Sequence, residues 1–155
     1  MAKKATPHDG QLMLQLYDLR REAEMRKARN WWLVDFWPQS IDDFMKVINA
    51  FGTQENAWSR QVSGYWDMAA SLVLQGALHE ELFLQPGSSG EMFFLFAKIR
   101  PYLKELREQM NNPDLWSNIE KVATGSKLAR KRLERVSATV EMRRKQMAKA
   151  AKKAS

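Results

Sequence analysis

The chain has 155 residues, of which 45% are hydrophobic, and its formal net charge is +7. These values fit one folded domain and exclude a fully disordered chain. The absence of cysteine excludes disulfides, thiolate metal sites and cysteine nucleophiles, and it fits the reducing cytoplasm in which we expect the protein. The uncharged apolar run Met68–Leu78 is far shorter than the ~20 residues of a membrane-spanning helix, so we expect no transmembrane segment.

The N-terminal quarter of the chain predicts a disordered tail over residues 1–9 and one long helix over residues 10–37. Leucines recur on one helical face in the first half of that helix, and Pro38 ends it. Its second half, residues 30–37, is rich in tryptophan and follows a run of Arg and Lys. Such a cluster could meet a membrane surface or stacked bases, but the aromatic residues available elsewhere favour a place in the core.

Capping residues predict the next two helices. Ser40 is a suitable N-cap, Asp43 is placed to complete a capping box, and Gly52 is a natural terminator. Thr53 can cap the following helix, which we expect to end at Gly76.

The second half of the chain predicts a short helical turn over residues 78–84 and a loop over residues 85–90, where the sequence reads QPGSSG. A long helix over residues 91–110 should bend at Pro101. No segment shows the sustained alternation typical of a strand. We therefore predict an all-α, single-domain bundle of four to five helices over residues 10–112, followed by a long basic C-terminal helix.

Positive charge is concentrated in that last helix. Residues 121–155 contain 12 Lys and Arg against only Glu134 and Glu141, whereas residues 1–120 contain 13 Lys and Arg against 16 acidic residues. Such asymmetry is typical of an anionic partner or an interaction tail. We expect the helix over residues 113–147, partly packed on the bundle, and a disordered Lys/Ala tail over residues 148–155.

The functional hypothesis is a non-enzymatic interaction module whose C-terminal helix binds a polyanion. Nucleic-acid backbone is the first candidate, without sequence specificity, because cations at every turn can each neutralise a phosphate. A solvated helix that only aids solubility and contact with a membrane surface are the competing interpretations. The expected polyanion-binding residues are Lys127, Arg130, Lys131, Arg132, Arg135, Arg143, Arg144 and Lys145.

A narrow apolar seam runs along the same helix through Leu133, Val136 and Val140. This seam could dock on the body of the protein or pair with a second copy. The alternative function is therefore a structural or assembly subunit that forms a homo-oligomer through this helix and has no role with nucleic acid.

The sequence offers little chemistry for catalysis. Of the two histidines, His8 lies in the expected tail and His79 lies beside two glutamates, without the second histidine of a metal site. Asp67, on an apolar helix, would need a cationic partner if it were buried. The candidates for this partner are Arg60, Lys98 and Arg100. We expect no enzyme activity, no metal and no cofactor.

Overall fold

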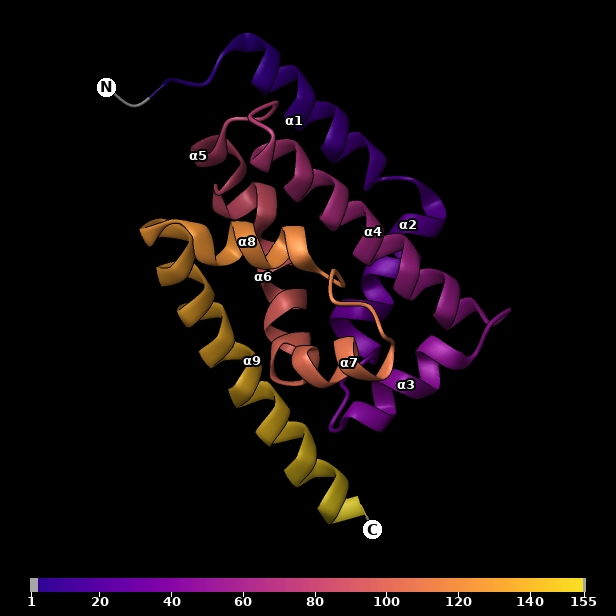
Figure 1. The fold of residues 1–155 in the computed structure, drawn as a ribbon. Coiled ribbons are helices and arrows are strands. Elements are labelled where there is room, and N and C mark those ends of the chain that lie inside the picture. The colour runs from indigo at the N-terminus through magenta and orange to yellow at the C-terminus, as the bar shows by residue number, and fades with distance from the viewer. Residues whose placement is uncertain (1–2, 155) are drawn as a thin grey trace.

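Helices make up nearly all the regular structure of residues 3–154, the part of the chain that the computed structural model describes (Figure 1). No strand occurs in these residues, which confirms the predicted all-α domain with a long C-terminal helix. In chain order the α-helices, with one π-helix (η1) and one 3-10 helix (η2), are α1 (Pro7–Leu19), α2 (Ala23–Asn30), η1 (Trp31–Asp35), α3 (Ile41–Asn49), α4 (Gln54–Leu74), α5 (Glu80–Phe83), α6 (Pro86–Ile99), η2 (Arg100–Tyr102), α7 (Leu103–Gln109), α8 (Ser117–Gly125) and α9 (Lys127–Ala154).

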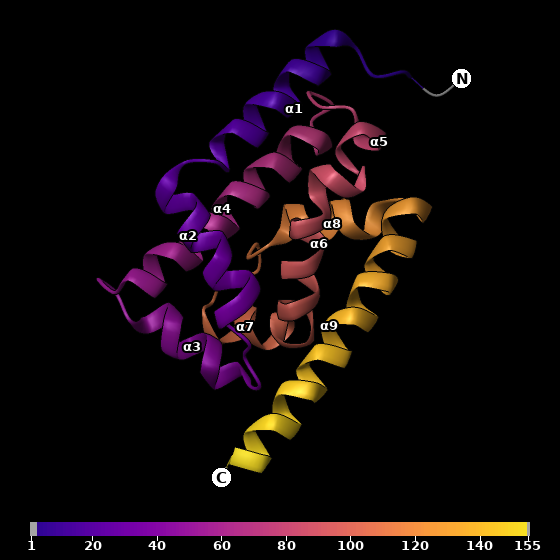
Figure 2. The ribbon, with the colours of Figure 1, turned by 180° about the vertical axis from the view of Figure 1, so that it is seen from behind.

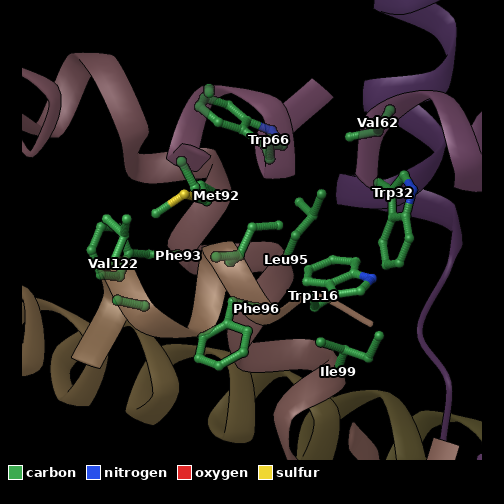
Figure 3. Close-up of a cluster of buried hydrophobic side chains, with 14 of the residues drawn as sticks. Trp32, Val62, Trp66, Met92, Phe93, Leu95, Phe96, Ile99, Trp116 and Val122 are labelled. Carbon is green, nitrogen blue, oxygen red and sulfur yellow. The ribbon is translucent and has the colours of Figure 1, made fainter. Parts of the chain in front are cut away.

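Helix α6 forms the centre of the molecule, with α8 and α9 packed against it (Figure 1). From Met92 to Ile99 every residue except Phe94 is buried, as expected of a helix that is apolar on nearly every side. Figure 3 shows Phe93, Phe96 and their neighbours meeting side chains from α4, α8 and η1. The core is therefore built around α6.

The aromatic cluster of residues 30–37 belongs to this core, as predicted. Trp31 is 8% exposed and Trp32 is 1% exposed. The Trp32 ring lies 5.8 Å from the ring of Trp116, which precedes α8, and both are visible in Figure 3. These tryptophans hold η1 and the start of α8 together.

The single helix predicted over residues 10–37 is wrong, because the chain breaks after α1 and again at η1. The Glu22 carboxylate caps α2 by accepting hydrogen bonds from the backbone N–H groups of Glu24 (3.1 Å) and Met25 (2.8 Å). Helix α1 also begins earlier than expected, since Thr6 and Asp9 form a complete capping box. Residues 7–9 are thus helical, while residues 1 and 2 lie outside the described part of the chain.

The capping signals of the next two helices are confirmed. Ser40 and Asp43 form the capping box of α3, and Thr53 caps α4. Gly52 and Gly76 have φ angles of 86° and 71°, the left-handed conformation that favours glycine after a helix.

The loop predicted over residues 85–90 is wrong: α6 begins at Pro86, which occupies its first turn. The start of this helix packs against other parts of the chain. Ser89 is fully buried, and a Cβ at Gly90 would lie 3.9 Å from the guanidinium of Arg132 on α9. The predicted bend at Pro101 is confirmed, since η2 separates α6 from α7.

The continuous last helix predicted over residues 113–147 is interrupted. Helix α8 ends at Gly125, and Ser126 has extended backbone angles (φ −117°, ψ 161°). The Ser126 hydroxyl then accepts a hydrogen bond from the backbone N–H of Ala129 at 3.1 Å, so it caps α9. Helix α9 continues to Ala154, beyond the end that we expected.

Candidate polyanion-binding surface

Helix α9 docks along one side of the body, against α6 and α8, as both views of the fold show (Figures 1 and 2). Its apolar seam makes this contact: Leu133 is 2% exposed, Val140 is 1% exposed and Val136 is half-buried. The seam is therefore covered by the chain's own body. A second copy could pair with it only if α9 first left α6.

Two of the expected polyanion-binding residues, Arg132 and Arg144, point into this interface. The Arg132 guanidinium donates to the carbonyl oxygen of Leu84 and lies 5.1 Å from the ring centre of Phe93. Arg144 donates to the carbonyl oxygen of Lys98 at 3.0 Å. Both side chains bind the body and are not part of the exposed surface.

The opposite side of α9 carries an outer basic face, which we define as Lys127, Lys131, Arg135, Lys145 and Lys149. These residues are exposed and recur largely at four-residue intervals, the spacing of one helical face. None of them forms an ion pair with a carboxylate in residues 3–154. At 1.5 Å per residue, the face is roughly 33 Å long.

Arg130 and Arg143 flank this face. Arg130 donates to the carbonyl oxygen of Thr124 at 2.8 Å, and the Arg143 guanidinium lies 5.9 Å from the ring centre of Phe94. Both residues are exposed overall and could turn toward a ligand at the edge of the face. Six of the eight predicted polyanion-binding residues are thus exposed on α9.

A lysine whose burial was not predicted from the sequence lies beneath α9. Lys98 is 0% exposed, and its amine donates to the carbonyl oxygens of Trp32 (2.5 Å) and Phe36 (2.6 Å). Burial, with a smaller contribution from the nearby cations Arg144 and Arg143, lowers its pKa to about 7. The sequence does contain an indication of this burial, because Lys98 lies within the otherwise apolar run of α6, where a side chain cannot face water.

The polar residues considered for catalysis have structural partners. One carboxylate oxygen of Asp67 accepts a hydrogen bond from the Asn118 amide at 2.8 Å, which joins α4 to α8. The backbone N–H of His79 donates to Asp9 at 2.8 Å, and its ring contacts the Lys3 carbonyl oxygen. Across residues 3–154, no group of three His, Asp or Glu side chains is close enough to hold a metal ion.

The comparisons assign a family to most of the chain. Residues 5–126 match a domain of unknown function, DUF4760, and the chain belongs to this family. No curated protein and no solved structure matches the chain. The matched segment ends at the junction of α8 and α9, so the outer basic face lies beyond it. Within the described residues, no helix is both long and apolar enough to cross a bilayer.

Proposed function

We propose that this member of the family binds the backbone of nucleic acid through the outer basic face of α9, without reading base sequence. The observation that carries the proposal is the division of α9 into two sides. Its apolar seam, Arg132 and Arg144 are engaged by the body, whereas the outer face holds cations that have no carboxylate partner in residues 3–154.

Electrostatics favours a polyanion as the partner of this face. Each phosphate that a lysine or arginine neutralises releases a condensed counterion, which makes the affinity fall as salt rises. Because α9 is already docked and helical, binding would cost little ordering of the backbone. Lysine dominates the face and acts as a point charge, which suits contact with phosphates more than recognition of base edges.

The alternative, a homo-oligomer formed through Leu133, Val136 and Val140, has less support. That seam is the surface by which α9 binds α6 and α8. Pairing through it would expose the apolar side of α6, at a cost of roughly 25 cal/mol for each Å² uncovered.

The test is binding of a labelled duplex of mixed sequence to the full-length protein, followed by fluorescence anisotropy over a series of salt concentrations. Truncation of α9 is unsuitable because it would uncover α6. Instead, charge is removed from the outer face by the triple substitution Lys131→Gln, Arg135→Gln, Lys145→Gln. The matched control removes the same charge from exposed residues outside α9, by Arg21→Gln, Arg26→Gln, Lys46→Gln.

If all five residues of the face contact phosphates, a plot of log affinity against log salt concentration should have a slope of about −4 to −5. The outer-face variant should make this slope shallower by about 3. The control variant should keep a slope close to that of the unmodified protein. Equal losses in the two variants would mean that only net charge matters. Absence of duplex binding at low salt, or binding to anionic lipid vesicles alone, would refute the proposal.

A further inference from the structure

The side chain of Arg20 is buried without a hydrogen-bonding partner. Arg20 follows the last residue of α1 and is 7% exposed. Its guanidinium carbon lies 5.3 Å from the ring centres of both Tyr17 and Trp66. No acceptor or carboxylate in residues 3–154 meets its N–H groups, although a guanidinium has five donors, and its nitrogen atoms are not sealed off in the protein interior.

The neighbouring acid does not neutralise this charge. Glu91 is bound by Arg29, whose Nε and Nη2 atoms both lie 2.8 Å from the same carboxylate oxygen. The other oxygen of Glu91 accepts the indole N–H of Trp66 at 3.0 Å. Tyr65 is not a counter-ion either, because its hydroxyl donates to the carbonyl oxygen of Leu16 at 2.6 Å. Arg20 is thus the uncompensated cation of this region.

Arg20 faces a cavity of ≈ 200 Å³ between α1, α4, α5 and the start of α6. Its walls are largely apolar, and the aromatic side chains of Tyr17, Tyr65, Trp66 and Phe83 form part of them. A cavity of about 150 Å³ is large enough for benzene, so this one has room for one aromatic ring and a small polar group.

The first turn of α6 forms another wall of the cavity and adds hydrogen-bond donors to it. Gly87 and Ser88 line it, and α6 has no side-chain cap. Within the described chain, the backbone N–H of Gly87 and the hydroxyl of Ser88 have no acceptor. The positive end of a 14-residue helix and a buried guanidinium therefore converge on one cavity.

We infer that this cavity binds a small organic carboxylate whose apolar body is about the size of one aromatic ring. A guanidinium can donate two parallel hydrogen bonds to a carboxylate, and the helix start and Ser88 can supply the remaining donors. The aromatic walls contact the apolar body, a contact that inorganic phosphate cannot make. None of the lining residues lies on α9, so this site is independent of the outer basic face.

Benzoate is the probe, and binding to the full-length protein is measured by isothermal titration calorimetry at neutral pH. Saturable binding is expected, and benzyl alcohol, which has the same ring without the charge, should bind at least about tenfold more weakly. Arg20→Gln should weaken benzoate binding by at least about tenfold, because charge-assisted hydrogen bonds to the carboxylate are lost. The matched control is Arg21→Gln, which removes the same charge from the adjacent exposed residue and should leave the affinity unchanged.

A second variant keeps the test decisive if Arg20→Gln does not fold. Gly87 lines the cavity and is exposed, and a Cβ there would meet no atom within 4 Å, so Gly87→Leu places a bulky apolar side chain at the cavity entrance without a clash. It should abolish benzoate binding while the circular dichroism spectrum stays helical. The inference is overturned if benzoate does not saturate the unmodified protein by ~10 mM, a very weak affinity. It is also overturned if benzyl alcohol or phosphate binds as tightly as benzoate, or if the Arg20 or Gly87 variant binds benzoate normally.

Discussion

Lys98 should make the protein more stable as the pH rises from 7 to about 9. Its pKa is about 7 in the folded chain, where burial disfavours the ammonium form, against 10.5 for an ordinary lysine. Between these two values the unfolded chain binds more protons than the folded chain, so the free energy of unfolding increases with pH. At ~1.36 kcal/mol per pH unit, and with the folded amine half-protonated near pH 7, the gain up to pH 9 is about 2 kcal/mol.

Urea unfolding followed by tryptophan fluorescence at neutral and alkaline pH measures this gain. Lys98→Met keeps much of the side-chain volume but cannot titrate, so its stability should rise less over the same range by about 2 kcal/mol. Lys104→Met, at an exposed position on α7, should keep the full rise. If the curves of the unmodified protein and Lys98→Met run parallel, the buried amine keeps its proton in the folded state and the reasoning is refuted.

Two further predictions concern buried acids. Arg29→Met leaves Glu91, whose side chain is 6% exposed, without its cation and should cost about 3–5 kcal/mol in urea unfolding. The double variant Arg29→Met, Glu91→Met should recover part of this loss, and a single-variant cost below about 1 kcal/mol would contradict the argument. Hydrogen bonds from Thr6, first through its side chain, hold the pKa of Asp9 at about 2 instead of 3.8. The stability that Asp9 contributes is complete above its unfolded pKa and is lost as the pH falls from about 4 through 2. In a plot of Tm against pH, Asp9→Asn should therefore reduce the fall in Tm over this acid range. An equal fall in Tm for the variant and the unmodified protein would contradict this role of Asp9.

The features that sequence predicted correctly depend on residues close together in the chain. The capping box of Ser40 and Asp43 spans three positions, and the turn at Gly52 leads directly into the cap at Thr53. Such signals are satisfied by the backbone beside them, so they can be recognised without knowing the tertiary structure.

The errors arise where distant packing decides the local conformation. Residues 85–90 have the composition of a loop, yet they begin α6 because Ser89 is buried and Gly90 lies against Arg132, more than forty residues away. The break before α2 depends on Glu22, whose carboxylate caps the helix although glutamate is not a usual N-cap. Neither contact is apparent in the linear sequence.

The candidate surface was partly predictable. The concentration of charge on α9 follows directly from the sequence, but two of the eight expected polyanion-binding residues, Arg132 and Arg144, bind the body instead. Arg132 lies four residues before Val136 and Arg144 lies four residues after Val140, so helical geometry places both beside the apolar seam. Long basic side chains readily lay their apolar stems over such a seam. Arg20 gave no comparable signal, because the ring of Trp66 comes from another helix.

The central position of α6 has a consequence for the synthesis of the protein. Two of the helices that cover it, α8 and α9, are translated after it. The 28 residues of α9 alone take about 1–6 s to add at ordinary rates of elongation. During that interval α9 does not yet pack over Phe93 and Phe96, so the nascent chain exposes an apolar helix to other proteins. The time for which α6 stays uncovered during synthesis is therefore set by how quickly α9 is added and docks.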